Sequence, residues 1–169
     1  KSHIRNIPDF PIKGIIYKDI TTLLKEPQVF SYVINLLTKR YKNKNISKVV
    51  GIESRGFIFG SALSYNINSG FVPIRKPGKL PSKKIEQEYT LEYGTDKLEI
   101  HTDAVKENEK VLIIDDLIAT GGTAVAAIDL LDRLKANIIE CAFLIELKDL
   151  DGISKIKKRK VNTFSICKY

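Results

Sequence analysis

One segment constrains the fold more than any other: the four apolar residues 111–114, followed by Asp-Asp-Leu-Ile-Ala-Thr-Gly-Gly-Thr up to Thr123. A short run that is wholly apolar is typical of a strand buried on both faces of a sheet. Similar runs recur over residues 48–52, 71–74 and 138–147. Helical patterns separate these runs, so the sequence predicts an α/β fold with a central, mostly parallel sheet covered by helices on both faces.

The rest of the chain shows weaker patterns. Apolar residues spaced three and four apart behind Pro27 predict a helix over residues 27–41. Residues 79–89 are polar and have no period, which predicts a mobile loop, and alternation around Gly94-Thr95-Asp96 predicts a hairpin over residues 89–105. The other expected elements are helices over about 56–65 and 123–135, a last strand over 161–166 and a solvated lysine-rich turn over 155–160.

The charge of the chain is unusual for a protein of 169 residues. Its 28 Lys and Arg against 20 Asp and Glu give a formal net charge of +8, which predicts an anionic partner. The surplus lies at the two ends: residues 1–50 hold ten basic and three acidic side chains, and residues 151–169 hold six and one. No aromatic residues interleave with the lysine cluster as a single-strand nucleic-acid platform requires. The expected anion is therefore a small one.

The composition also indicates in which cellular compartment the chain is expected. The two cysteines, Cys141 and Cys167, both lie in apolar runs, which predicts free thiols in a reducing compartment. Residues 56–74 carry no charge, but they include serine, asparagine, glycine and proline, so they read as a helix, a loop and a strand of a core. The first residues lack the apolar stretch of a signal peptide. We expect a soluble, cytoplasmic chain without a membrane partner.

The residues after the 111–114 run have the composition of an anion-binding turn. Small residues let backbone N–H groups approach a phosphate, and a helix that starts there adds its dipole and its unpaired donors. The residues expected to bind a ribose phosphate are Ala119, Thr120, Gly121, Gly122 and Thr123.

Two acidic residues directly before a phosphate cradle require a ligand that also carries hydroxyls. Asp115 and Asp116 are suited to accept hydrogen bonds from the vicinal hydroxyls of a ribose. Neither G-x-x-x-x-G-K-[ST] nor G-x-G-x-x-G occurs in the chain, which excludes the common nucleotide-binding motifs. The sequence therefore predicts a ribose-phosphate binder.

This segment resembles the phosphoribosyl pyrophosphate fingerprint of type I phosphoribosyltransferases. Four more blocks, in the same order along the chain, resemble the members of that family that act on adenine. They are Phe10-Pro-Ile-Lys-Gly-Ile-Ile-Tyr-Lys-Asp-Ile-Thr21, Glu53-Ser-Arg-Gly-Phe57, Arg75-Lys-Pro-Gly-Lys-Leu-Pro81, and Leu91-Glu-Tyr-Gly94 with Leu98-Glu-Ile-His101. The resemblance implies a single phosphoribosyltransferase domain over residues 1–169, with a base-binding hood at about 1–26 and a flexible β-hairpin lid loop at about 77–95.

The resemblance also implies the reaction. Adenine and 5-phosphoribosyl 1-pyrophosphate would give AMP and pyrophosphate, a step of purine salvage. Mg²⁺ would be the cofactor, held mainly by substrate and water and not directly by protein ligands. A homodimer is implied, and no nucleic acid is expected as a partner.

Three groups of residues acquire roles from the resemblance. The catalytic group is Glu92, Tyr93 and Arg55, with Glu92 handling a proton at N7 or N9 of the base. The adenine-binding group is Ile16, Tyr17 and Lys18, with Tyr17 stacking on the base and backbone groups reading its edge. The pyrophosphate-binding group is Glu53, Ser54, Arg55, Gly56, Arg75, Lys76 and Lys79, and the family has a cis peptide bond at the position between Glu53 and Ser54.

Two other interpretations stay open from the sequence. A transferase of the same fold that acts on another purine differs only in the N-terminal block. A regulator that keeps the ribose-phosphate site and binds nucleic acid would account for the net charge, and its binding would depend steeply on salt.

The role of Glu92 predicts a specific change in the pH–rate profile. Replacing Glu92 by Gln removes a titrating group, so kcat should fall by roughly 10²–10⁴-fold and one limb of the profile should flatten. Steady-state rates between pH 5 and 9 measure this, with Glu88→Gln as the control. An unchanged profile for Glu92→Gln would remove this residue from the proton transfer.

Overall fold

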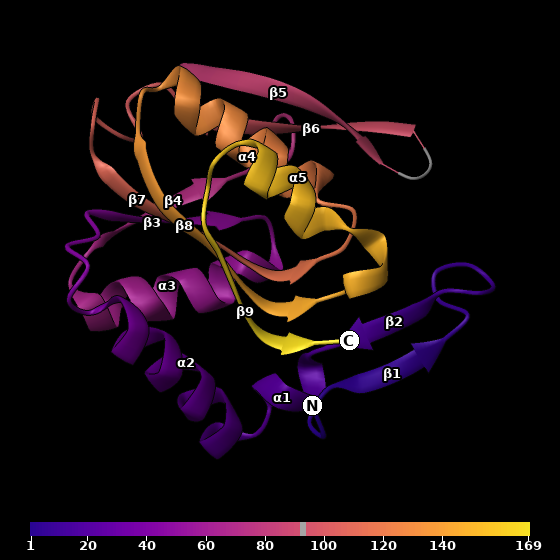
Figure 1. Ribbon diagram of the computed structural model, residues 1–169. Helices are drawn as coiled ribbons and strands as arrows, with labels where there is room; N and C mark the ends of the chain where they lie inside the picture. Colours follow the sequence, from indigo (N-terminus) through magenta and orange to yellow (C-terminus); the bar gives the residue numbers. More distant parts are fainter. Residues whose placement is uncertain (92–93) are drawn as a thin grey trace. The chain divides into compact units, whose positions relative to one another are not determined.

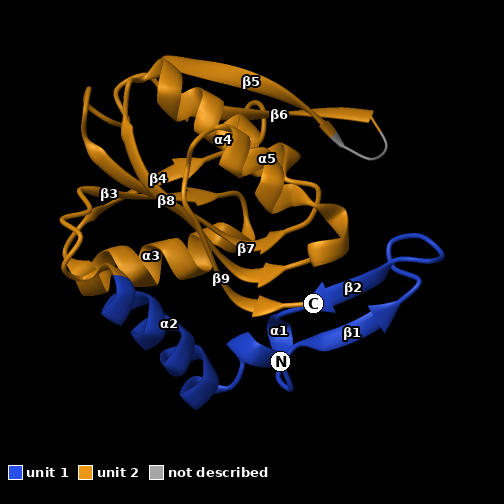
Figure 2. Cartoon of the chain, viewed as in Figure 1, with its two compact units in different colours: residues 1–40 blue, residues 41–169 orange. Residues whose placement is uncertain are grey.

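The computed structural model describes residues 1–91 and 94–169, except for the side chain of Leu91. Glu92 and Tyr93 therefore lie outside the described residues. The chain forms two compact units, residues 1–40 and residues 41–169 (Figure 2). Each unit is described by itself.

Unit 1 contains a short antiparallel pair of strands and two helices. Strands β1 (Arg5–Pro8) and β2 (Ile16–Asp19) are followed by α1 (Thr21–Leu24) and by α2 (Pro27–Tyr41), whose last residue belongs to unit 2. The register places Arg5 opposite Asp19, and Arg5 Nε donates to Asp19 Oδ2 at 3.0 Å. Hydrogen bonds from the Thr21 backbone and from Arg5 lower the pKa of Asp19 to about 2. The predicted helix over residues 27–41 is confirmed.

Unit 2 is built on a five-stranded parallel sheet with the strand order β4-β3-β7-β8-β9. Figure 1 shows α3 on one side of this sheet and α4 and α5 on the other. The predicted α/β class, with a parallel sheet and helices on both faces, is confirmed. The elements are β3 (Lys48–Ile52), α3 (Arg55–Ile67), β4 (Gly70–Ile74), β7 (Lys110–Ile118), α4 (Gly122–Arg133), β8 (Asn137–Glu146), a 3-10 turn (Lys148–Leu150), α5 (Gly152–Lys158) and β9 (Thr163–Lys168).

The sheet is buried on both faces, as the apolar runs predict. Along β7, Val111 and Ile113 belong to the core that α4 covers, whereas Ile114 packs towards Gly60 of α3. Each such side chain stabilises the fold by about 1.5–3 kcal/mol when it leaves water. No helix among the described residues is long and apolar enough to cross a membrane.

The predicted mobile loop over residues 79–89 is wrong in its second half. Strand β5 (Lys84–Leu91) pairs with β6 (Gly94–His101) in an antiparallel hairpin, so Gly94, Thr95 and Asp96 lie in a strand and not in its turn. Side chains at 85, 87 and 89 face inward and those at 84, 86, 88 and 90 are exposed. Because a glutamine interrupts this alternation, the period of two is hard to see in the sequence.

Two other boundaries differ from the sequence prediction. Strand β7 continues to Ile118, so Asp115 and Asp116 lie within it, because its parallel ladder with β8 extends to that residue. The lysine-rich turn expected at 155–160 is helical up to Lys158, since Ile156 and the half-buried Ile153 attach α5 to the core.

A buried hydrogen bond at the start of unit 2 generates a stability prediction. The hydroxyl of Tyr41 donates to Glu140 Oε2 at 2.6 Å, and both residues are buried. Tyr41→Phe removes a hydrogen bond to a charged group, so the free energy of unfolding should fall by about 1.5–3 kcal/mol in urea denaturation. Tyr65→Phe, at a residue that is 87% exposed, is the control and should change it by less than about 0.5 kcal/mol. A loss below that control value for Tyr41→Phe would contradict the prediction.

Candidate active site

Most of the predicted site residues of unit 2 that the structure describes lie in or just after the carboxyl-terminal parts of three neighbouring strands, at the same edge of the sheet. The parallel register pairs Ile52 with Ile74 and Gly51 with Ile114, so Glu53, Arg75 and the Asp115–Asp116 pair come at the same level. In open α/β sheets, ligands bind outside the carboxyl ends of the strands. The topology therefore brings together blocks that are far apart in the sequence.

The loop after β3 is short and lies against β7. Only Glu53 and Ser54 separate β3 from α3, and the peptide bond between them is cis, as the family resemblance implies. A Cβ atom at Gly56 would lie 2.7 Å from the backbone oxygen of Ile114. Glycine at this position thus permits the first turn of α3 to contact the backbone of β7.

Arg55 connects this loop to the acidic pair. Its Nε atom lies 3.0 Å from Oδ2 of Asp116, a residue that is 3% exposed. Burial and the neighbouring charge of Asp116 raise the pKa of Asp115 well above its ordinary value. Burial also raises the pKa of Asp116, although the guanidinium of Arg55 opposes this. Arg55 thus pairs with the buried Asp116, and its charge also acts against the rise in the pKa of the half-buried Asp115 beside it.

Glu53 is the centre of a second charge cluster. Its carboxylate accepts hydrogen bonds from Arg75 Nε at 3.0 Å, from the backbone N–H of Lys76 at 2.8 Å, and from the ammonium of Lys79. Burial raises the pKa of Glu53, but the bonds from Lys79, Lys76 and Arg75 outweigh it and lower the pKa to about 2. Two predicted pyrophosphate ligands, Arg75 and Lys79, thus share one carboxylate at the same edge, which compensates only one of their two charges.

Lys76 points to a different neighbour. Its ammonium donates to the hydroxyl of Tyr89 at 2.6 Å and to Asp96, both in the β5–β6 hairpin. Burial opposes protonation, but these partners raise the pKa of Lys76. The structure therefore places Lys76 as a link to the hairpin. Sequence reasoning missed its two partners, because no motif connects them to Lys76.

The predicted phosphate loop joins β7 to α4. Ala119 and Thr120 follow the strand, Gly121 has a left-handed φ of 82°, and Gly122 and Thr123 begin the helix. The unpaired N–H groups of the first turn and the helix dipole are therefore at the loop, as an anion site requires.

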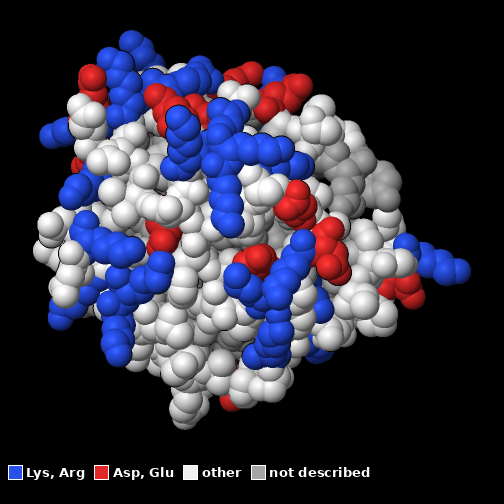
Figure 3. All heavy atoms as spheres, viewed as in Figure 1, with Lys and Arg blue, Asp and Glu red and all other residues white. Residues whose placement is uncertain are grey.

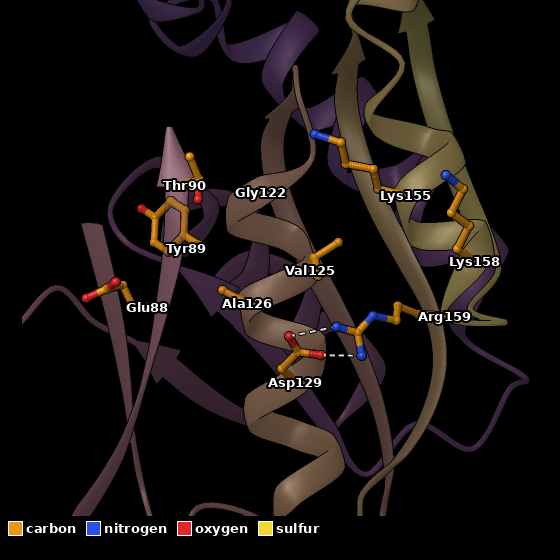
Figure 4. Close-up of a pocket in the computed structure, with 10 residues that line it drawn as sticks. All are labelled: Glu88, Tyr89, Thr90, Gly122, Val125, Ala126, Asp129, Lys155, Lys158 and Arg159. Atoms are coloured by element: carbon orange, nitrogen blue, oxygen red, sulfur yellow. Dashed lines mark hydrogen bonds and ion pairs between the residues drawn. The ribbon is translucent and has the colours of Figure 1, made fainter. Parts of the chain in front are cut away.

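Two cavities flank this loop. One of about 370 Å³ lies between β5, α4 and α5, and Figure 4 shows Gly122 and Thr90 at its wall. In it, the guanidinium of Arg159 is paired with the carboxylate of Asp129, at 2.7 Å. The other cavity, of about 230 Å³, is lined by Ala119 and by residues between Glu146 and Lys157, Gly152 among them. The loop is thus accessible on two sides.

The predicted adenine-binding residues lie together on β2 of unit 1. Ile16 is 55% exposed, and Lys18 Nζ donates to Asn6 Oδ1 at 2.9 Å. The ring of Tyr17 packs edge-to-face on Phe10, with ring centroids 5.2 Å apart. Phe10 is itself half exposed and is not among the predicted site residues, although it opens the block in which Tyr17 lies.

The described residues contain no group of three or more His, Cys, Asp or Glu side chains that could hold a metal ion. Mg²⁺ usually keeps several waters and binds through substrate phosphates with one or two carboxylates. The donor set of this edge fits a magnesium ion that arrives with its substrate.

Surface charge is distributed unevenly. Figure 3 shows Lys and Arg side chains over much of one face, with a dense group over α5 and acidic side chains between. The lysines of α5, Lys155, Lys157 and Lys158, all lie in its last turn. Most of the excess of basic over acidic side chains therefore lies on the surface of the protein.

The low pKa of Glu53 predicts a pH dependence of stability. Its pKa is about 2 in the folded chain against an ordinary value of 4.5, so its contribution is present above about pH 4.5 and is lost as the pH falls through 2. Between pH 5 and 2 the free energy of unfolding should fall by about 2–3 kcal/mol more in the wild type than in Glu53→Gln. Urea denaturation over this pH range measures the difference. Glu107→Gln, which breaks an exposed pair with Lys135, is the control and should follow the wild type, and an equal pH dependence of all three would contradict the prediction.

Comparison with known proteins agrees with this geometry. A family model described as the phosphoribosyl transferase domain matches residues 19–168. The adenine phosphoribosyltransferase of Psychromonas ingrahamii is 55% identical over 169 residues, which cover 100% of this chain and 93% of that protein. The crystal structure of adenine phosphoribosyltransferase from Thermoanaerobacter pseudethanolicus matches with a TM-score of 0.95 at 47% identity, over 99% of this chain and 96% of that one.

A further similar structure is that of adenine phosphoribosyltransferase from Saccharomyces cerevisiae, complexed with D-2,5-dideoxy-2,5-imino-altritol 1,6-bisphosphate and adenine. It matches with a TM-score of 0.91 at 38% identity, over 98% of this chain and 95% of that one. The chain belongs to the adenine phosphoribosyltransferase family.

Proposed function

We propose that this chain transfers the phosphoribosyl group of 5-phosphoribosyl 1-pyrophosphate to adenine and forms AMP and pyrophosphate. The observation that carries the proposal is the meeting of the acidic pair, the phosphate loop and the cationic loops at one sheet edge, in a chain of this family. The relative from Saccharomyces cerevisiae binds adenine and a bisphosphate, which is the ligand chemistry expected here.

The ribose 5-phosphate is held by the loop at the start of α4. Backbone N–H groups of residues 119–123 and the hydroxyls of Thr120 and Thr123 donate to the phosphate oxygens. The ribose hydroxyls donate to Asp115 and Asp116, whose backbone is fixed within β7. Arg55 keeps negative charge on Asp116, and so favours its role as an acceptor.

The leaving pyrophosphate is bound at the loops after β3 and β4. As the bond at C1 of the ribose breaks, negative charge develops on the leaving oxygens, and fixed donors at that place stabilise the transition state. The donors are the backbone of Ser54 and Gly56 and the side chains of Arg55, Arg75 and Lys79. Glu53 holds Arg75 and Lys79 in place before the ligand binds. A pyrophosphate carries more negative charge than this one carboxylate and competes for both cations.

A magnesium ion bound with the substrate would neutralise part of the charge on the pyrophosphate and so make it a better leaving group. Arg55, Arg75 and Lys79 and the backbone of Ser54 and Gly56 would bind the pyrophosphate oxygens that the ion leaves free.

The base is recognised by residues of β2 and its proton is handled by the hairpin block. Tyr17 stacks on adenine, while the backbone carbonyl and N–H groups of Ile16 and Lys18 read the base edge. A carbonyl that accepts from the 6-amino group disfavours 6-oxopurines by about 1–3 kcal/mol, because it is left unpaired against them. Glu92 and Tyr93, outside the described residues, supply the proton-handling pair. The lid loop over residues 77–95 excludes water from the reactive ribose.

We further propose a cytoplasmic homodimer as the working form. Neither a nucleic acid nor a membrane is a partner in this proposal, since a small pyrophosphorylated sugar already supplies the anionic partner that the basic chain is expected to have.

A base series tests the function directly. The chain is incubated with 5-phosphoribosyl 1-pyrophosphate, Mg²⁺ and adenine, hypoxanthine, guanine or xanthine in turn, and the nucleotides are separated by chromatography. We expect AMP from adenine, with kcat/KM at least about tenfold below this for every other base.

The control for the base series is a chain in which residues 120–122 are replaced by bulky residues. It should bind no ribose 5-phosphate and form no AMP, because the backbone donors are then covered. IMP, GMP or XMP as the main product would overturn the choice of base. The absence of any nucleotide from the wild type would overturn the proposed reaction itself.

A further inference from the structure

The first residue of α5 lies directly on the backbone of the phosphate loop. Gly152 is buried, and a Cβ atom built on it would overlap the backbone oxygen of Ala119 and lie 2.8 Å from the backbone nitrogen of Gly121. A Cβ atom on Gly121 would in turn lie 2.7 Å from the backbone oxygen of Gly152 and 2.9 Å from its Cα. Two glycines thus permit a backbone-to-backbone contact between α5 and the loop.

Glycine is required at position 152 because there is no room for a side chain, and not because of its backbone conformation. The glycines with a left-handed φ are Gly14, Gly78, Gly94 and Gly121, and Gly152 is not one of them. Its backbone conformation would therefore suit any residue. The atoms that a side chain would meet belong to the backbone of the loop and to Cγ1 of Ile118, at 2.9 Å, and they cannot swing away as the end of a long side chain can.

The same segment is attached to the loop a second time. The backbone N–H of Leu147 donates to the backbone oxygen of Ile118 at 3.0 Å, just before the loop begins. The chain then passes through the 3-10 turn at Lys148–Leu150 and returns to the loop at Gly152. Residues 118–121 are therefore held at both ends by one short segment.

Helix α5 is anchored to the core by two isoleucines. Ile156 is fully buried in the core and Ile153 packs against it, so the helix cannot easily shift away from a side chain at its first residue. Any added volume must instead displace the loop, whose N–H groups have to lie about 2.7–3.2 Å from the phosphate oxygens to bind them.

We propose that Gly152 is a positioning residue for the reaction: its lack of a side chain allows α5 to support the phosphate loop and sets the place of the loop's N–H groups. The residue touches no substrate in this proposal. It acts through Ala119 and Gly121 and therefore affects the binding of the ribose 5-phosphate more than the binding of the base. The inference rests on the proposed function, because it takes the loop to be the phosphate site.

The test compares Gly152→Ala with Gly70→Ala. The three atoms nearest to a Cβ at Gly70 all belong to the flexible side chain of Lys48, and Gly70 opens β4 at the sheet edge opposite the site. For Gly152→Ala we expect two constants to rise about 10- to 100-fold: the Kd for ribose 5-phosphate, by calorimetry, and the KM for phosphoribosyl pyrophosphate. The KM for adenine should change by less than about threefold. Gly70→Ala should match the wild type in all three.

A second variant covers the case in which Gly152→Ala does not fold. Ile153→Ala removes packing between α5 and the core and adds no volume at the loop. Because α5 then supports the loop less well, the KM for phosphoribosyl pyrophosphate should rise severalfold while the circular dichroism spectrum stays native. The proposal would be overturned if Gly152→Ala folds and its Kd for ribose 5-phosphate and its KM for phosphoribosyl pyrophosphate both stay within about twofold of wild type. If Gly152→Ala does not fold, an Ile153→Ala variant with an unchanged KM for phosphoribosyl pyrophosphate would overturn it. AMP formation by the wild type separates these outcomes from a failure of the proposed function.

Discussion

Strand β3 pairs in parallel with β4 on one side and with β7 on the other, and the whole site of unit 2 depends on this pairing. The register places the residues that follow β3 and β4 at the level of Asp115 and Asp116 within β7, so that Glu53 meets Arg75 and Arg55 meets Asp116. A slip of one residue would exchange the two faces of a strand and separate these pairs. The apolar side chains that fix the register are therefore as important to the site as the charged ones.

Each of these charged side chains has an oppositely charged partner before any ligand binds. Asp116 is paired with Arg55, and Glu53 with Arg75 and Lys79, in places that are only partly open to water. An unpaired charge at such depth would be costly. Hydrogen bonds complete the pairs of Glu53, whereas Asp116 Oδ2 is held by the charge of Arg55 without a hydrogen bond from any described residue. In the proposed function, a ligand with a phosphate and hydroxyls would exchange partners with these pairs.

The sequence predicts those parts of the structure whose signal is local. The buried strands are visible because each is a short apolar run, and the turn before α4 because a group of small residues follows the β7 segment. The hairpin strand β5 escapes prediction because its inward side chains gain their burial from Leu98 and Ile100 of the partner strand. Helix α5 escapes it because seven residues give it only two apolar positions. The pairing of Lys76 with Asp96 and the contact of Gly152 with the loop arise from the packing of distant segments, and no spacing along the chain announces them.

Arg75 has a consequence for the hairpin that its side chain alone does not suggest. Its backbone exchanges two hydrogen bonds with Glu99 of β6, at 2.9 and 2.8 Å, while its guanidinium holds the carboxylate of Glu53. Its neighbour Lys76 reaches Asp96, which lies earlier in the same strand. The β5–β6 hairpin is therefore attached to the end of β4 both through the backbone of Arg75 and through the side chain of Lys76. If an anion draws the guanidinium of Arg75 away from Glu53, as the proposed function expects, the strand that moves with Arg75 is also the one that carries the hairpin.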